Sequence, residues 1–304
     1  MDVGLEVWGA DYPQIEAACQ HAAALGLDGF AYGESPHPLN LDCSTVLAAL
    51  ARSTERIRLG PVIANVLPDY RSSLLLSRQL ATLAALAPGR IELRTGVGAA
   101  TAFARPWWEP HGVRYPAYDE RCADLAAAIE VMSATWQASD VAIPITLAAT
   151  GERAMMLAAR VAQVWETSFC TPAEYARRRA LFDEIIERES PARVVARSLE
   201  IDGFLAPTAN GVDRVLAAVR ADRGGAEDLE PILDRALVGT PDEVADQLHA
   251  LAAVGVERVL VALHDPMDLD AIAALAEAAE RVRSVEQSAD ATDESLSDKR
   301  GTNP

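Results

Sequence analysis

Positive charge is scarce in this chain. Its 304 residues include 27 basic and 45 acidic side chains, which gives a formal net charge of −18, and Lys299 is the only lysine. Nucleic acids and anionic membranes are bound through basic protein surface. The composition therefore argues against both classes of partner.

Cysteines are few, and long apolar runs are absent. Cys19, Cys43, Cys122 and Cys170 are scattered without a C-x-x-C pair, and the sequence contains no metal-binding pattern. The first twelve residues carry acids where a secretory signal has basic residues, and no apolar run is long enough to cross a membrane. The sequence thus predicts a cytoplasmic protein with no metal and no membrane span.

Half of the residues are hydrophobic, which is enough for a large core. Short apolar strands are expected near residues 3–8, 28–33, 57–63, 90–96, 143–148, 163–168, 196–205 and 256–263. Helical periodicity follows them near residues 12–25, 42–53, 71–87, 117–136, 151–161, 172–189, 241–254 and 268–284. Eight alternating strand–helix units predict an α/β protein with a single (β/α)8 TIM barrel.

An open doubly wound sheet is the alternative fold. It usually has a glycine-rich turn after the first strand, where this chain has only Trp8-Gly9-Ala10-Asp11. One extra helix is expected near residues 209–221. The barrel domain is expected to cover residues 1–284, and the polar, acidic and aperiodic residues 285–304 predict a disordered tail.

The most informative segment runs from Ile57 to Gly98, a strand, a helix and a second strand. A helix this long between two strands makes them parallel, so their carboxyl ends share one rim. This segment resembles the bacterial luciferase-like family of flavin- and deazaflavin-dependent oxidoreductases, in which R-I-R-L-G leads through a bend and a helix to G-R-x-E-L-G-x-G-x-G. The stretches Tyr118–Trp136 and Leu237–Val261 resemble the same family.

The resemblance implies an oxidoreductase that binds reduced flavin across the carboxyl-terminal rim. Its leading interpretation is a monooxygenase that uses reduced FMN, supplied by a separate flavin reductase, to oxygenate a small organic substrate. The alternative is a reductase or dehydrogenase that uses the deazaflavin coenzyme F420 and transfers a hydride. A non-catalytic flavin-binding protein is a further alternative. The family also implies a homodimer.

Two rim residues are candidates for proton transfer. Glu34 ends the second strand and matches the acid that luciferase-like enzymes carry there. The family follows this acid with histidine, whereas this chain has Ser35 and reaches a histidine only at His37. An imidazole titrates near neutral pH and suits proton transfer. A loop histidine bonded to backbone is the alternative for His37.

The cofactor residues are inferred from the same resemblance. Asn65 matches the position of a bend, often with a non-prolyl cis peptide, that supports the central flavin ring. Gly96 ends the fourth strand beside it. Thr150, Gly151 and Arg153 lie at a helix start, where backbone N–H groups and the helix dipole favour phosphate. The turn at 207–211 is the alternative phosphate site, because TIM barrels often use the loop after the seventh strand.

Strand alternation predicts which side chains enter the barrel. Val3, Leu5 and Val7 should face the helices, which leaves Glu6 and Trp8 facing inward, with Trp8 at the rim. Arg94 should also point inward. A buried guanidinium must be paired, so Arg94 either forms an ion pair with inward acids or binds an acidic substrate group. The candidate acids are Glu6, Glu92, Glu200 and Asp202.

The loop after the fourth strand is rich in aromatic residues although only 5% of the chain is aromatic. Apolar, aromatic surface is typical of substrate pockets. The loop should therefore form a substrate wall with Trp107, Trp108 and His111, while His264, which ends the eighth strand, could point into the same site. The aromatic residues of the loop are Phe103, Trp107, Trp108 and Tyr115.

Overall fold

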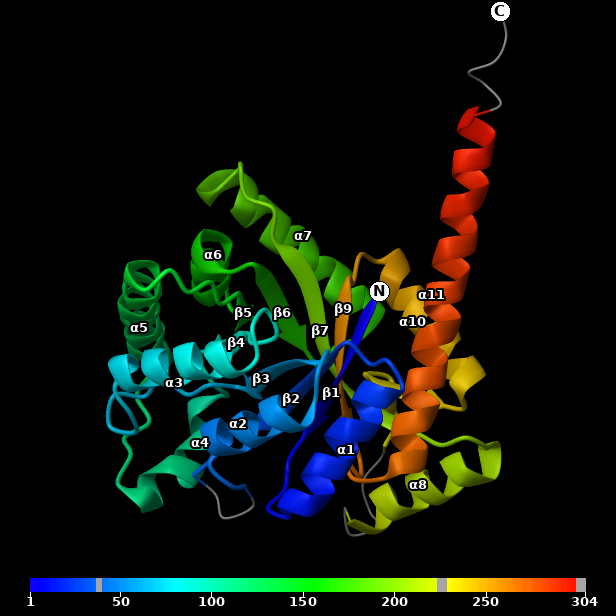
Figure 1. The fold of residues 1–304 in the computed structure, drawn as a ribbon, viewed down its shortest axis with the longest axis horizontal. Helices are drawn as coiled ribbons and strands as arrows, with labels where there is room; N and C mark the ends of the chain where they lie inside the picture. Colours follow the sequence, from blue (N-terminus) through cyan, green and yellow to red (C-terminus); the bar gives the residue numbers. More distant parts are fainter. Residues whose placement is uncertain (37–39, 223–228, 299–304) are drawn as a thin grey trace, which may run out of the picture.

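Parallel strands and surrounding helices form a barrel in the computed structural model, which describes residues 1–36, 40–222 and 229–298 (Figure 1). The strands are β1 (Asp2–Val7), β2 (Gly29–Gly33), β3 (Arg58–Val62), β4 (Leu93–Gly96), β5 (Ile145–Ala148), β6 (Val164–Ser168), β7 (Ala196–Leu205), β8 (Ala236–Gly239) and β9 (Arg258–Leu263). The strands pair in parallel, in the order β3-β2-β1-β9-β7-β6-β5-β4. The bridges Leu59–Ile91 and Ala64–Thr95 close the ring between β3 and β4.

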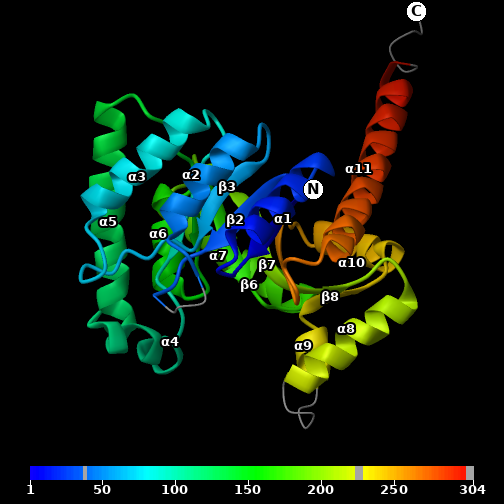
Figure 2. The same ribbon diagram turned by 60° about the horizontal axis from the view of Figure 1, so that its bottom comes forward.

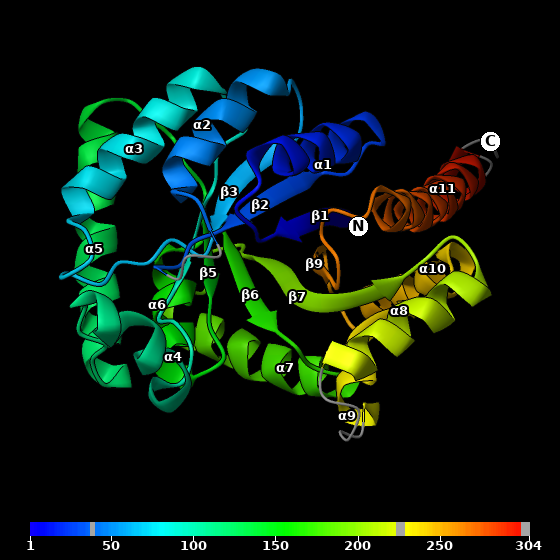
Figure 3. The same cartoon turned by 90° about the horizontal axis from the view of Figure 1, so that it is seen from below.

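Helices cover the outer face of this ring, as the view in Figure 3 shows. They are α1 (Tyr12–Ala24), α2 (Cys43–Ser53), α3 (Ser73–Leu86), α4 (Thr101–Trp108), α5 (Tyr118–Ala138), α6 (Glu152–Val161), α7 (Pro172–Glu189), α8 (Ala209–Asp222), α9 (Glu230–Leu233), α10 (Pro241–Ala253) and α11 (Leu269–Asp298), with a short 3-10 turn, η1 (Glu109–His111). The predicted (β/α)8 barrel is confirmed.

Local signals in the sequence account for several of the helix starts. Thr171 accepts a hydrogen bond from the backbone N–H of Glu174, whose carboxylate accepts one from the N–H of Thr171. Thr240 and Glu243 form the same capping box at the start of α10. Each box satisfies N–H groups that a helix start leaves without partners, and proline fixes the first helical position in both.

Three elements differ from the sequence prediction. The segment Thr101–Trp108 was expected to be a loop but is helix α4, even though it contains Pro106. Strand β8 was missed, and it pairs with β7 outside the ring of eight. Helix α11 continues to Asp298, past the predicted boundary at residue 284 (Figure 1). The predicted disorder of residues 285–304 stays a prediction.

The helices α4 and α8 lie on one side of the barrel, at the lower edge of Figures 1 and 2. They follow β4 and β7 directly along the chain, so this side carries the carboxyl ends of the strands. The main core lies between strands and helices and includes Val3, Leu5 and Val7. The predicted outward orientation of these three residues is confirmed, so Glu6 between them faces the barrel interior.

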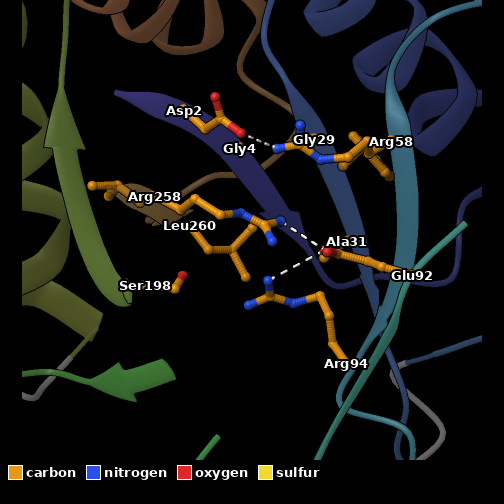
Figure 4. A pocket seen from close by; sticks show the side chains of 12 residues that line it. Asp2, Gly4, Gly29, Ala31, Arg58, Glu92, Arg94, Ser198, Arg258 and Leu260 are labelled. Atoms are coloured by element: carbon orange, nitrogen blue, oxygen red, sulfur yellow. Dashed lines mark hydrogen bonds and ion pairs between the residues drawn. The ribbon is translucent and has the colours of Figure 1, made fainter. Parts of the chain in front are cut away.

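Charged side chains fill the inside of the barrel. Arg94 is 2% exposed, and its Nη2 donates to both carboxylate oxygens of Glu166 at 2.5 Å. Glu92 lies between Arg94 and Arg258, at 3.4 and 2.8 Å (Figure 4). Burial alone would raise the pKa of Glu92, but Arg94 and Arg258 hold it below its usual value. The ion-pair interpretation of Arg94 is thereby favoured over substrate binding.

Candidate active site

A cavity of about 470 Å³ opens at the carboxyl-terminal rim of the barrel. It is bounded by the ends of six strands, by α4 and by the loops that follow β3 and β4. Its lining residues are Glu6, Trp8, Glu34, Ser35, Val62, Ile63, Asn65, Gly96, Val97, Gly98, Ala99, Ala100, Phe103, Ala104, Trp107, Trp108, Tyr115, Ala148, Ala149, Thr150, Ser168, Phe169 and Glu200. Among these lining residues none is basic.

One wall of the cavity is the bend that follows β3. The peptide bond between Val62 and Ile63 is cis, as the family resemblance suggested for this bend. The amide of Asn65 donates through Nδ2 to the carbonyl oxygens of Ile63 and Glu34, at 3.1 Å each. These hydrogen bonds fix Asn65 across the bend, so that the bend presents a rigid edge to the cavity.

Glu34 supports this bend from behind. Its Oε2 accepts a hydrogen bond from the backbone N–H of Asn65 and another from Arg71, both at 2.6 Å. Burial raises the pKa of Glu34, although Arg71 and the Asn65 N–H act in the opposite direction. The two short charge-assisted contacts stabilise the ionised carboxylate. Glu34 lines the cavity as predicted, and Arg71, which sequence reasoning missed, is its partner.

Glycines shape the walls where backbone and aromatic rings approach closely. A Cβ at Gly96 would lie 2.9 Å from the carbonyl oxygen of Ala148. A Cβ at Gly33 would lie 2.3 Å from the ring of Trp8. The predicted cofactor residue Gly96 therefore borders the cavity with bare backbone, which leaves room for a flat group against this wall.

The start of helix α6 forms a second part of the rim. Thr150 lines the cavity, and Gly151 is the N-cap residue, without a side-chain hydrogen bond to the first turn. A Cβ at Gly151 would lie 2.5 Å from the hydroxyl of Tyr118. Arg153 points instead to the exposed Asp119, with Nη1 and Oδ1 3.0 Å apart, and does not line the cavity. Of the predicted phosphate residues, only Thr150 borders the cavity.

Helix α4 covers the cavity with aromatic side chains. Phe103 and Trp107 are 60% and 41% exposed, and their ring centroids lie 5.1 Å apart. Trp108 is buried in a small cluster with Tyr115, and it meets Tyr70 edge-on at 5.1 Å. The predicted aromatic wall is present, although it stands on a helix. We call Trp8, Phe103 and Trp107 the aromatic lip.

The remaining predicted residues lie outside the cavity. His111 ends the exposed turn η1, and His264 lies 3.4 Å from Asp222 and beside the ring of Phe204. Arg94 is paired beneath the cavity with Glu166, a partner that sequence reasoning did not name. The inward position of Glu166 could have been predicted from the alternation of side chains along Val164–Ser168. His37 lies outside the described residues.

The floor of the cavity is acidic. Glu6 and Glu200 both line it. Burial is the main cause that raises the pKa of Glu6 to about 7, and nearby acids add to it, whereas Trp8 and Arg94 lower it. Burial and the negative charge of Glu6 raise the pKa of Glu200 well above its usual value. Such paired, perturbed carboxyl groups in a cavity are typical of functional sites.

Two further findings concern the described part of the chain. Within it, no three histidine, cysteine, aspartate or glutamate side chains are arranged to hold a metal ion. The helices of residues 1–36, 40–222 and 229–298 include none that is long and apolar enough to cross a bilayer.

Sequence relatives with assigned activities match only part of this chain. An F420-dependent glucose-6-phosphate dehydrogenase of Beutenbergia cavernae is 32% identical over 135 residues, which cover 38% of each protein. The corresponding enzyme of Nocardia farcinica is 33% identical over 96 residues, which cover 30% of this chain and 26% of that enzyme. The chain thus matches less than two fifths of the length of either relative.

Solved structures match over nearly the whole chain. An F420-dependent secondary alcohol dehydrogenase in complex with an F420–acetone adduct has a TM-score of 0.77 at 14% identity, covering 92% of this chain and 98% of that one. The EDTA monooxygenase of Chelativorans sp. BNC1 has a TM-score of 0.74 at 15% identity, covering 100% and 95%. At these identities the likeness establishes the fold.

The family model for luciferase-like monooxygenases matches residues 5–202, about two thirds of the chain. This stretch holds β1 to β6, the bend after β3, the aromatic lip and the start of α6. The chain belongs to the luciferase-like monooxygenase family.

Proposed function

We propose that the cavity binds the tricyclic ring of a flavin or deazaflavin against the bend from Val62 to Asn65. The substrate in this proposal is a small, largely apolar molecule held under the aromatic lip. The observation that carries the proposal is the bend itself, which the hydrogen bonds of Asn65 fix and the Glu34–Arg71 ion pair braces. A rigid edge beside the bare backbone of Gly96 suits a flat, rigid ring.

The phosphate of the cofactor is assigned to the start of α6. Thr150 offers a hydroxyl at the cavity, and the first N–H groups of α6, which follow directly after it, have no partners within the helix. Because no lining residue is basic, backbone N–H groups and the helix dipole would carry most of the phosphate interaction. Arg153 would add charge only after leaving Asp119.

We place the deazaflavin coenzyme F420 ahead of FMN, which reverses the order suggested by the sequence alone. The support is that both sequence relatives described above are F420-dependent dehydrogenases. The acidic floor also suits such a reaction, because interconversion of an alcohol and a carbonyl requires a group that exchanges a proton. The bound deazaflavin would supply the hydride chemistry, while Glu6 and Glu200 face the substrate from below.

Reduced-FMN monooxygenation is the second candidate. Its support is the aromatic lip, since Trp8, Phe103 and Trp107 provide apolar cover that would limit water at the reacting centre. This function requires reduced FMN from a separate reductase. The reductase, the homodimer and the cytoplasmic location stay predictions from the sequence.

Anaerobic titration with reduced F420 and reduced FMN tests the proposal. We expect F420 to bind at least tenfold more tightly. With oxidised F420 supplied as the hydride acceptor, we also expect anaerobic turnover of small apolar alcohols such as 2-propanol. Tighter binding of FMN together with oxygen-dependent turnover would assign the monooxygenase function instead. Absence of binding by either cofactor would refute both candidates.

A further inference from the structure

Glu6 has a carboxylate oxygen without a partner. Its side chain is 5% exposed and lines the cavity floor. Trp8 donates its indole N–H to Oε1, while Oε2 is buried and has no hydrogen-bond partner in the described part of the chain. A buried acceptor without a donor is unfavourable. Its position at the cavity indicates that a bound molecule supplies the missing partner.

The cations near Glu6 are already engaged. Arg94 contacts Glu166 and Glu92, and Arg258 contacts Glu92. Among the described residues, neither Glu6 nor Glu200 forms an ion pair. The charged groups that act on these two acids from the surrounding strands are Arg94 of β4, Glu166 of β6 and Asp202 of β7. Arg258 of β9 is paired with Glu92.

This balance of charge favours a proton on the floor. Burial raises the pKa of Glu6 to about 7, and the acids Glu166 and Asp202 contribute in the same direction. The pKa of Glu200 is raised mainly by burial and next by the negative charge of Glu6. Two carboxyl groups in one cavity oppose each other's ionisation. Around neutral pH the pair can therefore both release and accept a proton.

Glu34 is less suited to that task. Its Oε2 accepts short hydrogen bonds from Arg71 and from the Asn65 N–H. These contacts stabilise the negative charge and hold the carboxylate in place. The structure therefore gives Glu34 a positioning role at the bend, and leaves Glu6, whose Oε2 has no partner among the described residues, as the candidate at the cavity floor.

We propose that Glu6 exchanges a proton with an oxygen of the substrate at the cavity floor. The inference rests on the proposed function, in which the cofactor accepts or donates the hydride. When a substrate hydroxyl is oxidised, its O–H bond breaks and a new O–H bond forms at Glu6 Oε2. In the reverse direction the same proton returns to the carbonyl oxygen. Glu6 transfers only the proton, and its oxidation state does not change.

The hydrogen bond from Trp8 to Glu6 provides a reporter that does not depend on activity. The indole N–H signal of Trp8, assigned with Trp8→Phe, is followed by ¹H–¹⁵N NMR from pH 5 to 9 in the cofactor-free protein. We expect a transition with a midpoint near 7. It should vanish in Glu6→Gln. The exposed Glu130→Gln on α5 is the matched control and should leave the midpoint unchanged.

Two probe molecules test whether a ligand reaches Glu6. Benzyl alcohol fits under an aromatic lip and offers one hydroxyl, whereas toluene has the same ring without it. A donated hydrogen bond stabilises the ionised carboxylate, so benzyl alcohol should lower the midpoint by about half a unit or more. Toluene should not lower it. Equal effects of both probes, or a midpoint that neither moves, would overturn the proposal.

Turnover separates this proposal from the proposed function. Glu6→Gln should lower turnover roughly 10²–10⁴-fold and abolish the limb of the pH–rate profile near 7, while cofactor affinity stays within about threefold. Full turnover in Glu6→Gln, with cofactor bound normally, would refute the role of Glu6 and leave the proposed function intact. Loss of cofactor binding by the wild-type protein would instead refute the proposed function.

Discussion

Arg94→Ala should strongly destabilise the barrel. The Arg94 guanidinium is 2% exposed, and its Nη2 lies 2.5 Å from both oxygens of Glu166, which is itself fully buried. Removal of the cation would leave Glu166 with a single remaining hydrogen bond, from Ser198 at 2.7 Å. Breaking a buried ion pair from one side typically costs about 3–5 kcal/mol. We expect a loss of that size in the free energy of unfolding.

Urea unfolding at pH 7 measures this loss, with an unchanged m-value showing that the same surface is exposed. Arg58→Ala is the matched control. Its partner Asp2 lies 2.8 Å away, but the two side chains are 33% and 44% exposed, so the pair should contribute only about 0–1 kcal/mol. If Arg94→Ala were as stable as wild type but inactive, Arg94 would be a substrate residue and the ion-pair account would be wrong.

The loss in the free energy of unfolding caused by Arg94→Ala should also depend on pH. Arg94 and Arg258 hold the pKa of Glu92 below its unfolded value despite its burial. A lowered carboxyl pKa contributes stability above the unfolded pKa and loses it as the pH falls through the folded pKa. The difference between wild type and variant should therefore be largest near pH 6–7 and should shrink below about pH 4.

The remaining predictions concern the rim and the floor. Thr150→Val should weaken cofactor binding by about 1.5–3 kcal/mol in a fluorescence titration, and unchanged affinity in both Thr150→Val and Arg153→Ala would move the phosphate to residues 207–211. His37→Asn should lower turnover by about 10²–10⁴ if this imidazole transfers a proton, and full turnover with an unchanged pH profile would make it a loop residue. Because the folded pKa of Glu6 is raised to about 7, its contribution to stability is full below the unfolded pKa and is lost as the pH rises through 7. Wild type should thus lose up to about 3 kcal/mol between pH 5 and 8 in urea unfolding, whereas Glu6→Gln should not.

The barrel was predictable because its signals are local. Alternation in β1 placed Val3, Leu5 and Val7 outward and Glu6 inward, and the long helix between β3 and β4 required parallel strands. Strand β8 was missed because it has four residues and pairs only with β7. Helix α4 was missed because Pro106 and a dense aromatic cluster are more typical of a loop than of a helix.

The site was predictable only in part, because contacts across the barrel leave little trace in one sequence. Glu34, Asn65 and Thr150 lie at strand ends or a helix start, where position along the chain already implies the rim. Arg71 contacts Glu34 across 37 positions of sequence, and Arg94 contacts Glu166 across 72. Nothing near Arg71 in the sequence distinguishes it from a solvated arginine. The prediction that Arg153 binds the cofactor phosphate likewise failed to anticipate the direction of its side chain, which forms an ion pair with Asp119.

Filling the cavity tests the central claim, that the ring of a flavin or deazaflavin binds against the bend after β3. Ala148 lines the cavity next to Gly96, so Ala148→Phe places a ring in the proposed cofactor space. Ala180→Phe on the exposed side of α7 is the control.

The measurement is equilibrium binding of F420 and of FMN to the three proteins, followed by fluorescence in the absence of oxygen. The account predicts that wild type and Ala180→Phe bind at least one of the two with equal affinity, and that Ala148→Phe, folded by circular dichroism, binds it at least about a hundredfold more weakly, a loss of roughly 2.7 kcal/mol. Unchanged cofactor affinity in a folded Ala148→Phe would contradict it.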